Sequence, residues 1–506
     1  MSKKYNVIIG LEIHAELKTK SKMFCSCFND AEEQKPNVNI CPICLGQPGT
    51  LPTPNKKAIE WTILLGLALN GKINKLSKFD RKNYFYPDLP KGYQISQFDL
   101  PFVYDGYLEV DHEKIKITRV HLEEDTGKST HPKNKNYSLI DFNRAGTPLV
   151  ELVTEPVLYD AEVAKKFCQR YQQILRYLNI SDADMEKGQM RCEANISVQE
   201  KDKWQYKGNC EIKPIGDYKL NAKVEVKNIN SFRAVEKAIN YEIKRQTNLL
   251  ENGKAQEIVQ ETRGWNEDQQ KTISQRTKET SADYRYFPEP DIPPIEISNE
   301  WIEKIKTGLT ELPAKKKQRF IDQYSLGEDA AEILVSDKYV ANYTENVISE
   351  LRAWINSTGD TWERQKKKLA RITSNWLTSE LFRYLKRDHK NIREIKITAE
   401  NFAELVTLVY QDKINSTAGQ KILEHMYNHG GDPSHIMTEL GLEQIDNTAE
   451  LEKAIKNILD KNQPQVEEYK AGKESVLQFF VGQTMASTKG KANPQIVIKI
   501  LKELLK

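Results

Sequence analysis

The sequence predicts an α+β protein in which a domain built on a largely antiparallel sheet precedes a region made only of helices. In the first 295 residues, short segments alternate apolar and polar side chains, which is the period of a strand with one buried face. A run of prolines at 288–294 then marks the exit from that domain. Beyond it, the chain is rich in Lys, Glu, Leu and Ile at helical spacing. We therefore expect a sheet domain at 1–295, a helical linker region at 296–355 and an all-helical region at 356–506.

Length and composition narrow the class of protein. The chain has 506 residues, enough for about three domains, and a net charge of +3, which neither requires nor excludes a nucleic-acid partner. The sequence contains no apolar run near the roughly 20 residues that span a bilayer. Its first residues lack the apolar core and cleavage site of a signal peptide. We expect a cytoplasmic protein that does not associate with a membrane.

The densest group of acidic residues lies in the stretch 119–155. Glu123 and Glu124 stand side by side there, and Glu151 follows after a polar turn. Apolar residues flank these acids, a pattern that indicates strands. Because like charges repel at short range, we expect a cation among them, and hence a metal site or a phosphate-handling site. The alternative is a solvated acidic loop.

The clearest strand pattern lies at residues 7–17. Apolar residues occupy the odd positions, whereas Glu12, His14 and Glu16 occupy even positions between them. Since alternate residues of a strand lie about 7 Å apart on one face, two carboxylates and an imidazole could converge on one ion. The alternative is a surface strand whose polar face meets water.

Two more predicted strands carry the same kind of polar face. Arg191 and Glu193 alternate on one of them, and Glu225 and Lys227 alternate on the other. The repetition predicts a sheet that is apolar behind and lined by acids and bases in front. Mg²⁺ prefers oxygen ligands and usually arrives with phosphates, so we expect this face to bind a metal–nucleotide complex.

Four of the seven cysteines form two close pairs, Cys25-x-Cys27 and Cys41-x-x-Cys44. Thiolates in this pattern form a tetrahedral zinc site, which would fasten a loop that is too polar to pack alone. Such a site has no open ligand position, so its role would be structural. The alternative is four reduced thiols, because a disulfide framework is not expected in a reducing cytosol.

Two further segments have the composition of ligand-binding surfaces. The loop at 79–97, which contains Lys82, combines aromatic residues with Arg, Lys and Gln and suits a polar, anionic or nucleotide-like ligand. A short basic turn at 489–494 contains Lys489 and Lys491, and its charge fits contact with a phosphate backbone. The alternatives are a packed surface loop and a solvated helical end.

These same segments closely resemble the B-subunit family of bacterial tRNA-dependent amidotransferases (GatB), and the end of the chain resembles the YqeY-like tail of that family. The resemblance covers essentially the whole chain. It rests on Val7-Ile-Ile-Gly-Leu-Glu-Ile-His14, Cys41-Pro-Ile-Cys-Leu-Gly-Gln-Pro-Gly49, His121-Leu-Glu-Glu-Asp-Thr-Gly-Lys128, Asp141-Phe-Asn-Arg-Ala-Gly-Thr-Pro-Leu149, Met190-Arg-Cys-Glu-Ala-Asn-Ile-Ser197, Val226-Lys-Asn-Ile-Asn-Ser-Phe232, Thr262-Arg-Gly-Trp265, Phe479-Phe-Val-Gly-Gln-Thr-Met485 and Lys489-Gly-Lys-Ala-Asn-Pro494.

The resemblance implies both a fold and an activity. The first domain would be a cradle similar to glutamine synthetase, followed by an all-α domain and a small all-α tail that hold the tRNA. With ATP and Mg²⁺, it would phosphorylate the glutamate or aspartate carried on mischarged Glu-tRNA(Gln) or Asp-tRNA(Asn). Ammonia from a glutamine-hydrolysing amidase subunit (GatA) would then give Gln-tRNA(Gln) or Asn-tRNA(Asn). A small third subunit (GatC) would complete the heterotrimer.

Roles for individual residues follow from that chemistry. Because His14 departs from an all-oxygen Mg²⁺ site, Mn²⁺ could also bind. We expect Glu12, His14, Glu124 and Glu151 to hold the metal, with Glu193 and Glu225 next, Arg191, Lys227 and Arg144 to contact phosphate, Lys82 and Glu123 to form the ammonia entrance, Cys25, Cys27, Cys41 and Cys44 to bind zinc, and Lys489 and Lys491 to contact tRNA.

Two other classes of function remain open at this point. A free-standing ammonia ligase acting on a small acid would explain the acidic sheet but not the helical tail. A non-catalytic tRNA-binding scaffold would explain the tail but not the carboxylates on strands. Turnover of free glutamate without tRNA would support the first, and absence of metal and nucleotide binding would support the second.

Overall fold

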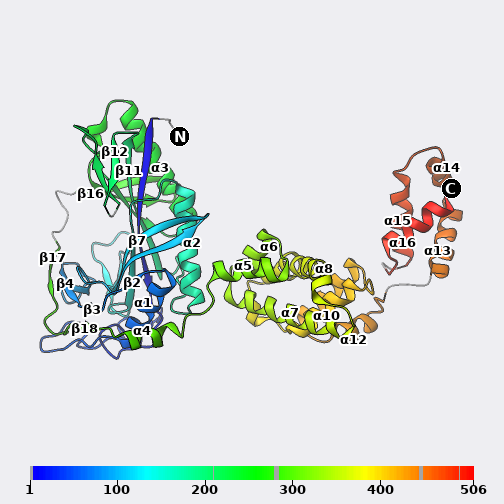
Figure 1. The fold of residues 1–506 in the computed structure, drawn as a ribbon, viewed down its shortest axis with the longest axis horizontal. Coiled ribbons are helices and arrows are strands. Elements are labelled where there is room, and N and C mark those ends of the chain that lie inside the picture. The colour runs from blue at the N-terminus through cyan, green and yellow to red at the C-terminus, as the bar shows by residue number, and fades with distance from the viewer. Residues whose placement is uncertain (1–3, 209, 278–283, 444–447, 489–490, 506) are drawn as a thin grey trace. The chain divides into compact units, whose positions relative to one another are not determined.

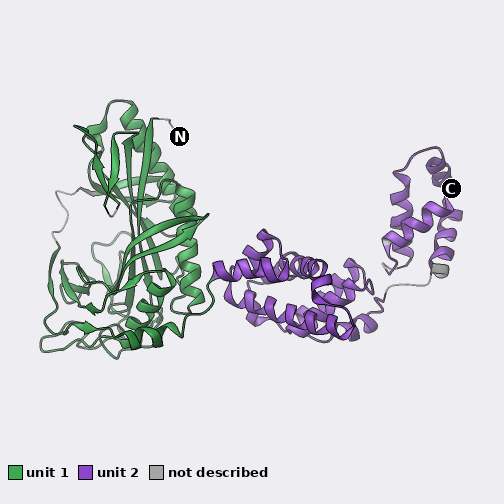
Figure 2. Ribbon diagram, in the orientation of Figure 1, with its two compact units in different colours: residues 1–312 green, residues 313–506 purple. Residues whose placement is uncertain are grey.

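The computed structural model describes residues 4–208, 210–277, 284–443, 448–488 and 491–505. It divides into two compact units, Met1–Leu312 and Pro313–Lys506 (Figure 2). The first unit contains the sheets, and the described residues of the second are helical or lie between helices (Figure 1). An α+β part followed by an all-helical part is therefore confirmed. The borders expected at 295/296 and 355/356 stay a prediction, because residues 296–312 belong to the first unit and 313–355 to the second.

The first unit is organised around a nine-stranded sheet in its described residues. Neighbouring strands are antiparallel, as expected, with the exception of β14 and β15, which run parallel. The physical reason is that a helix connects these two strands, and such a crossover returns the chain in the same direction. In spatial order the strands are β16 (Lys271–Thr277), β15 (Glu261–Asn266), β14 (Val224–Ile229), β11 (Met190–Glu200), β1 (Tyr5–Glu16), β10 (Pro148–Thr154), β7 (Glu113–Glu124), β6 (Val103–Val110) and β2 (Lys72–Ile73).

One face of this sheet is buried beneath helices. Ile9, Leu11 and Ile13 of β1 are buried in the same hydrophobic core as Phe167 and Val235 of two covering helices. The opposite face is therefore the one that carries the polar residues of β1. The helices of this unit are α1 (Lys56–Ala68), α2 (Ala161–Tyr177), α3 (Phe232–Glu251), the 3₁₀ turn η1 (Ala255–Glu257) and α4 (Asn299–Lys306).

The two covering helices begin where the sequence supplies N-capping side chains. Asp160 Oδ1 accepts hydrogen bonds from the first turn of α2, and Ser231 Oγ accepts one from the Ala234 amide of α3 at 3.1 Å. Each bond satisfies a backbone donor that lacks a partner within the helix. The helices expected near these positions are thus confirmed.

Smaller sheets complete the first unit. A three-stranded sheet, β17–β4–β5, joins the loop around Lys82 to the segment that follows residue 284. Its strands are β17 (Arg285–Pro288), β4 (Asp80–Asn83) and β5 (Tyr93–Ser96), and the two-stranded pairs are β18 (Ile295–Glu296) with β3 (Leu76–Ser77), β8 (Lys128–Thr130) with β9 (Leu139–Asp141), and β12 (Trp204–Lys207) with β13 (Glu211–Pro214).

The second unit contains two separate hydrophobic cores. The first lies between Phe320 and Leu442 and the second between Leu451 and Leu505. Around the first are α5 (Pro313–Tyr324), α6 (Glu328–Leu334), α7 (Lys338–Ser357), α8 (Trp362–Asn375), the π-helical turn η3 (Trp376–Leu381), α9 (Phe382–Arg387), η4 (Ile392–Glu394), α10 (Ala399–Tyr410), α11 (Ser416–His429) and α12 (Pro433–Glu439), and around the second are α13 (Thr448–Lys461), α14 (Gln463–Lys470), α15 (Val476–Ser487) and α16 (Pro494–Leu504). Among the described residues, no helix is both long and apolar enough to span a membrane.

Candidate active site and metal centre

The polar face of the large sheet continues across several neighbouring strands. His14 of β1 is paired with Glu151 of β10 on one side and with Arg191 of β11 on the other. Glu151 is in turn paired with His121 of β7. Because residues directly opposite one another on paired strands share a face, these four side chains form a row across the sheet.

The centre of this row is a cluster of carboxylates and imidazoles. His14 Nε2 lies 3.1 Å from Glu151 Oε2, 3.6 Å from Glu123 Oε1 and 3.9 Å from Glu12 Oε1. His121 Nε2 lies 3.2 Å from the same Glu151 Oε2. Three overlapping sets have ligand atoms within 4.8 Å of one another: Glu12, His14 and Glu151; His121, Glu123 and Glu151; Glu12, Glu193 and Glu225. Each set has the donors for a divalent cation.

The charges in this cluster perturb one another strongly. Burial disfavours a charged imidazole, yet the pKa of His14 rises to about 9 because Glu151, Glu123 and Glu12 surround it. Burial and the Glu151 carboxylate raise the pKa of Glu12 to about 7. Burial also opposes charge on Glu151, but His121 and His14 hold its pKa well below the ordinary value. A divalent cation bound here would displace the protons that His14 and Glu12 hold.

The basic residues expected to contact phosphate lie beside the cluster and are paired with acids. Lys227 Nζ is 2.7 Å from Glu193 Oε2 and 3.6 Å from Glu225 Oε1. Arg191 forms an ion pair with the buried Asp125, and Arg144 Nε lies 3.6 Å from the same carboxylate. These cations therefore offset part of the negative charge of the sheet face.

Glu124 and Glu123 exchange places relative to the expectation from the sequence. Glu124 Oε1 accepts a hydrogen bond from the Ile95 amide at 3.0 Å and pairs with Lys91 Nζ at 2.5 Å, so its carboxylate belongs to a different group from Glu12, His14 and Glu151. Glu123, expected at the ammonia entrance, lies in the carboxylate cluster instead. Adjacent residues of a strand point to opposite faces, so only one of the two can face His14.

His121 is a member of the cluster that the sequence reasoning missed. It stands two residues before Glu123 on β7, so the same alternation that groups Glu12 with His14 would have found it. Lys82, on β4, approaches the cluster from the small sheet: burial disfavours its charge, but Glu123, Tyr286 and Glu151 together raise its pKa. Its Nζ also lies 4.9 Å from the ring centre of Tyr284.

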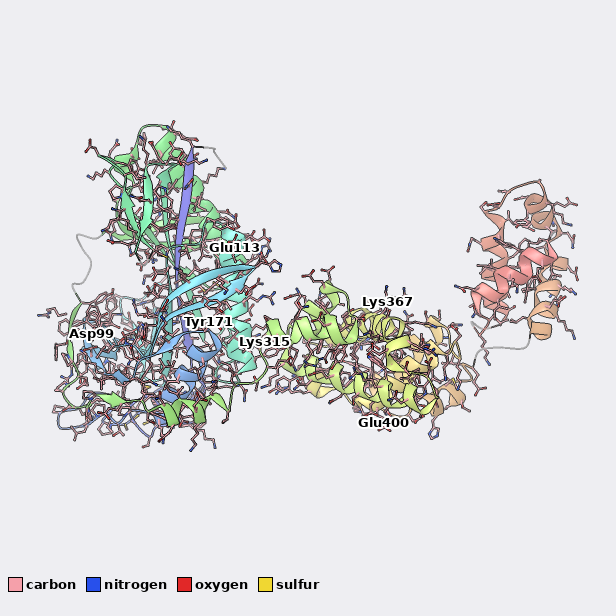
Figure 3. The ribbon with its side chains drawn as sticks, in the orientation of Figure 1. Asp99, Glu113, Tyr171, Lys315, Lys367 and Glu400 are labelled. Atoms are coloured by element: carbon pink, nitrogen blue, oxygen red, sulfur yellow. The ribbon has the colours of Figure 1, made fainter. Side chains whose placement is uncertain are left out.

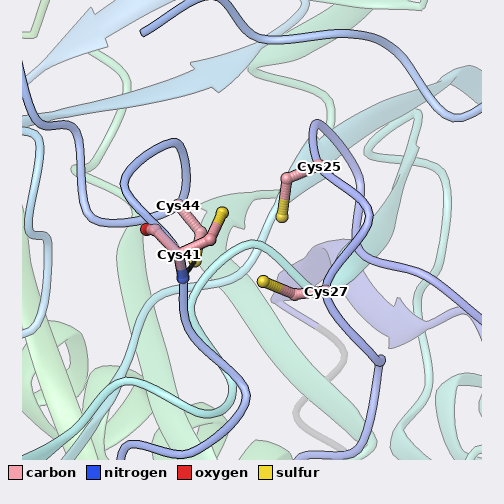
Figure 4. Close-up of side chains that lie close together, drawn as sticks. All are labelled: Cys25, Cys27, Cys41 and Cys44. Carbon is pink, nitrogen blue, oxygen red and sulfur yellow. Dashed lines mark hydrogen bonds between the residues drawn. The ribbon is translucent and has the colours of Figure 1, made fainter.

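A second group of metal-binding side chains lies in the loop after β1. The thiols of Cys25, Cys27, Cys41 and Cys44 point toward one another, and their sulfur atoms all lie within 4.8 Å of one another (Figure 4). A hydrogen bond from Cys25 lowers the pKa of the Cys44 thiol to about 5. Four sulfur donors from two short loops fit the tetrahedral coordination of zinc, so the group is compatible with a structural metal site, as the sequence predicts.

Basic residues gather in the second unit, where the sequence reasoning singled out only the tail. Residues 363–396 contain eleven Lys and Arg against four Asp and Glu, a net charge of +7, whereas the whole chain carries +3. Among them, Lys367 is exposed on α8 (Figure 3). Lys491 of the tail is half-buried, and Lys489 lies outside the described residues.

Sheet face and helical part together define a class of protein. Residues 7–303 match the family model described as the GatB/GatE catalytic domain, and residues 360–505 match the model described as the GatB domain. The chain therefore belongs to the GatB family. Relatives named as the B subunit of aspartyl/glutamyl-tRNA(Asn/Gln) amidotransferase include those of Persephonella marina (44% identical over 506 residues, 99% of this chain and 100% of the relative) and Thermoanaerobacter pseudethanolicus (45% identical over 506 residues, 99% of each chain).

Proposed function

We propose that this chain is the B component of a tRNA-dependent amidotransferase that converts Glu-tRNA(Gln) or Asp-tRNA(Asn) into Gln-tRNA(Gln) or Asn-tRNA(Asn). The observation that carries the proposal is full-length identity of 44% to proteins of that name, in a chain whose sheet presents a row of carboxylates and imidazoles. Since its substrate is a charged tRNA, the protein would work in the cytoplasm. A cradle similar to glutamine synthetase is the fold we propose for the first unit, supported by its large, mainly antiparallel sheet.

The chemistry needs two steps. A carboxylate is a poor acyl donor, because an oxide or hydroxide ion leaves badly. The side-chain carboxylate oxygen of the tRNA-bound amino acid would therefore attack the γ-phosphorus of ATP, with ADP leaving, and give an acyl phosphate. Ammonia would then attack the carbonyl carbon, inorganic phosphate would leave, and the amide would form after loss of a proton.

The carboxylate cluster is the proposed site of the first step. We propose that Glu12, His14 and Glu151 hold Mg²⁺, or Mn²⁺ in its place, with Glu193 and Glu225 as further carboxylates for the metal–nucleotide complex. Bound Mg²⁺ would neutralise charge on the phosphates of ATP. The shared Glu151 oxygen, 3.1 Å from His14 and 3.2 Å from His121, supports this assignment because two imidazoles hold it in one orientation.

The cations beside the cluster are the proposed phosphate contacts. Arg191, Lys227 and Arg144 would each exchange an acidic partner for a phosphate oxygen when ATP enters. Asp125 supports this role, because burial opposes its charge while Arg191 and Arg144 hold its pKa low, so the two guanidiniums are already oriented beside the cluster.

Lys82 and Glu123 are the proposed gate for ammonia. A conduit for ammonia needs polar walls, and Lys82 lies close enough to Glu123 for that carboxylate to raise its pKa. We propose that the ammonia comes from an amidase subunit (GatA) and that a small subunit (GatC) completes the heterotrimer. The names of the relatives, each given as one lettered component of an amidotransferase, support a multi-subunit enzyme.

Binding of the tRNA body is assigned to the second unit. Its stretch 363–396, with a net charge of +7, and the tail residues Lys489 and Lys491 would contact the phosphate backbone. A structural zinc ion at Cys25, Cys27, Cys41 and Cys44 would hold the loop after β1 in place.

Phosphate release from ATP tests the proposal. The chain, assembled with the amidase and small subunits, would be given glutamyl-tRNA(Gln), aspartyl-tRNA(Asn), uncharged tRNA or free glutamate. We expect release only with a mischarged tRNA, and the active tRNA then names the substrate. Release with free glutamate would indicate a small-molecule ligase, and no release in any reaction would indicate a tRNA-binding scaffold.

A further inference from the structure

Lys22 is a fully buried lysine beside the four cysteines. Its side chain has no exposed surface, and its Nζ lies 3.3 Å from the carbonyl oxygen of Phe142 and 3.9 Å from the sulfur of Cys44. Those are the hydrogen bonds of this ammonium within the described part of the chain, and no carboxylate there forms an ion pair with it. A buried ammonium without an anionic partner is strongly destabilising, so Lys22 requires an anion nearby.

The four-cysteine group supplies that anion when it holds a metal. Four thiolates around one Zn²⁺ carry a net charge of −2, and a partly buried centre with that charge also needs compensation. Across the described residues, the sulfur of Cys44 is the only atom of the group for which the structure records a hydrogen bond from a lysine. Each buried charge thus offsets the unfavourable burial of the other.

We propose that Lys22 is the counter-charge of the four-cysteine metal centre and positions the Cys44 thiolate by hydrogen bonding. The proposal rests on the proposed occupation of that centre by zinc. Lys22 neutralises part of the excess charge of the loaded centre, and the Phe142 carbonyl orients its ammonium.

A tight turn makes room for this contact. Gly146 has a φ of +88°, which other residues rarely adopt, and a Cβ there would lie 3.4 Å from Lys22 Cδ and 3.5 Å from Cys44 Cβ. The Gly146 carbonyl accepts a hydrogen bond from the Met23 amide at 2.7 Å, and its amide donates to the Asp125 carbonyl at 2.9 Å. Lys22 therefore sits where the cysteine loop is joined to the strand end that carries Asp125.

Zinc retention by the full-length chain tests the assignment. Three variants would be compared with the wild type: Lys22→Met, of similar length but uncharged; Lys22→Arg, which keeps the charge; and Lys20→Met, at an exposed position two residues away. Loss of a partner of a metal ligand usually weakens binding roughly 10- to 100-fold. We expect zinc transfer to a chromogenic chelator to become at least about tenfold faster in Lys22→Met, with Lys20→Met unchanged and Lys22→Arg between them.

Two measurements separate this role from general packing. In the Co²⁺-substituted protein, the sulfur-to-metal charge-transfer band should shift in Lys22→Met, because the thiolate loses its hydrogen bond. Site-resolved alkylation should also speed up at Cys44 relative to Cys25 in the same molecule. If Lys22→Met does not fold, Lys22→Gln, which keeps a donor without charge, provides the same two readouts.

The possible failures can be told apart. A wild-type chain that holds no zinc would overturn the metal centre itself. Zinc in the wild type, with equal release rates, an unshifted Co²⁺ band and an unchanged Cys44-to-Cys25 ratio in Lys22→Met, would overturn the role of Lys22 alone.

Discussion

His14 and Glu151 occupy directly opposed positions on strands β1 and β10, and His14 Nε2 lies 3.1 Å from Glu151 Oε2. The two residues are far apart in the sequence, and the pairing of two antiparallel strands brings them together. Glu151 is buried, with an exposed fraction of 5%, and its Oε2 also lies 3.2 Å from His121 Nε2. One carboxylate oxygen therefore links two imidazoles at the centre of the sheet face.

Removing the charge of Glu151 should weaken metal binding. Glu151→Gln keeps the shape of the side chain, but its neutral amide is a poor ligand, so we expect Mn²⁺ affinity to fall roughly 10- to 100-fold. The measurement is the amount of free Mn²⁺ in titrations followed by electron paramagnetic resonance. Glu109→Gln, at an exposed position on β6, is the matched control. Unchanged Mn²⁺ affinity in Glu151→Gln would remove this residue from the metal site.

The neighbours Glu123 and Glu124 should behave differently when each is changed to glutamine. Glu123→Gln should weaken Mn²⁺ binding, because its carboxylate lies 3.6 Å from His14. Glu124→Gln should leave Mn²⁺ affinity unchanged but lower the free energy of unfolding by about 3–5 kcal/mol, because it leaves the largely buried side chain of Lys91 without its partner. Mn²⁺ titration and denaturant unfolding of both variants provide the comparison.

A double variant serves as the control for Glu124. Changing Glu124 to Leu and Lys91 to Met removes both charges, so most of the lost stability should return. If Glu124→Gln instead weakens Mn²⁺ binding at unchanged stability, the sequence-based assignment of Glu124 as a metal ligand is right.

Glu16 should make stability depend on pH. Burial and the neighbouring Asp125 raise its pKa from 4.5 to about 8. The folded protein therefore holds a proton that the unfolded chain has released between these two values, and the free energy of unfolding falls as pH rises from about 4.5 to 8. Glu16→Gln removes this effect, so we expect it to raise Tm by several degrees at pH 8.5 and hardly at pH 5.

Calorimetry without added divalent cation tests this dependence, with Glu109→Gln as the control. An equal Tm difference between Glu16→Gln and the wild type at both pH values would contradict the raised pKa of Glu16.

Metal removal should destabilise the cysteine loop. We expect one zinc ion per chain by elemental analysis, and a lower Tm after treatment with a strong chelator, because the binding free energy of a structural metal contributes to folding. Cys41→Ser should lose most of the zinc. Cys210→Ser should keep it, since Cys210 lies outside the four-cysteine group. Equal zinc content in these two variants would contradict the site.

The basic stretch of the second unit should contribute to tRNA binding. The double change of Lys367 and Lys368 to Glu should weaken tRNA affinity roughly tenfold and lower the slope of log affinity against log salt by about 2, if each lysine contacts one phosphate. The same change at Lys304 and Lys306, exposed on α4, is the matched control. Equal losses in the two double variants, measured by filter binding at several salt concentrations, would assign the effect to net charge alone.

Several parts of the fold and the site could be predicted from the sequence because they depend on local order. The alternation at 7–17 predicted strand β1 and grouped Glu12 with His14, since side chains of a strand alternate at a period of two. The spacing of Cys25, Cys27, Cys41 and Cys44 predicted that the four thiols gather, since two short loops need only fold toward each other.

What the tertiary structure alone decided concerns pairings between distant segments. Whether Glu123 or Glu124 faces His14 depends on how β7 aligns with β10, and a shift of one residue would exchange the two. The parallel pairing of β14 and β15 likewise follows from the path of α3 across the sheet. Lys22 lies beside Cys44 only because the turn at Gly146 closes over both, a contact between three segments that no local pattern encodes. The sequence by itself determined which residues carry the chemistry, and long-range strand pairing and loop packing decided which of them meet.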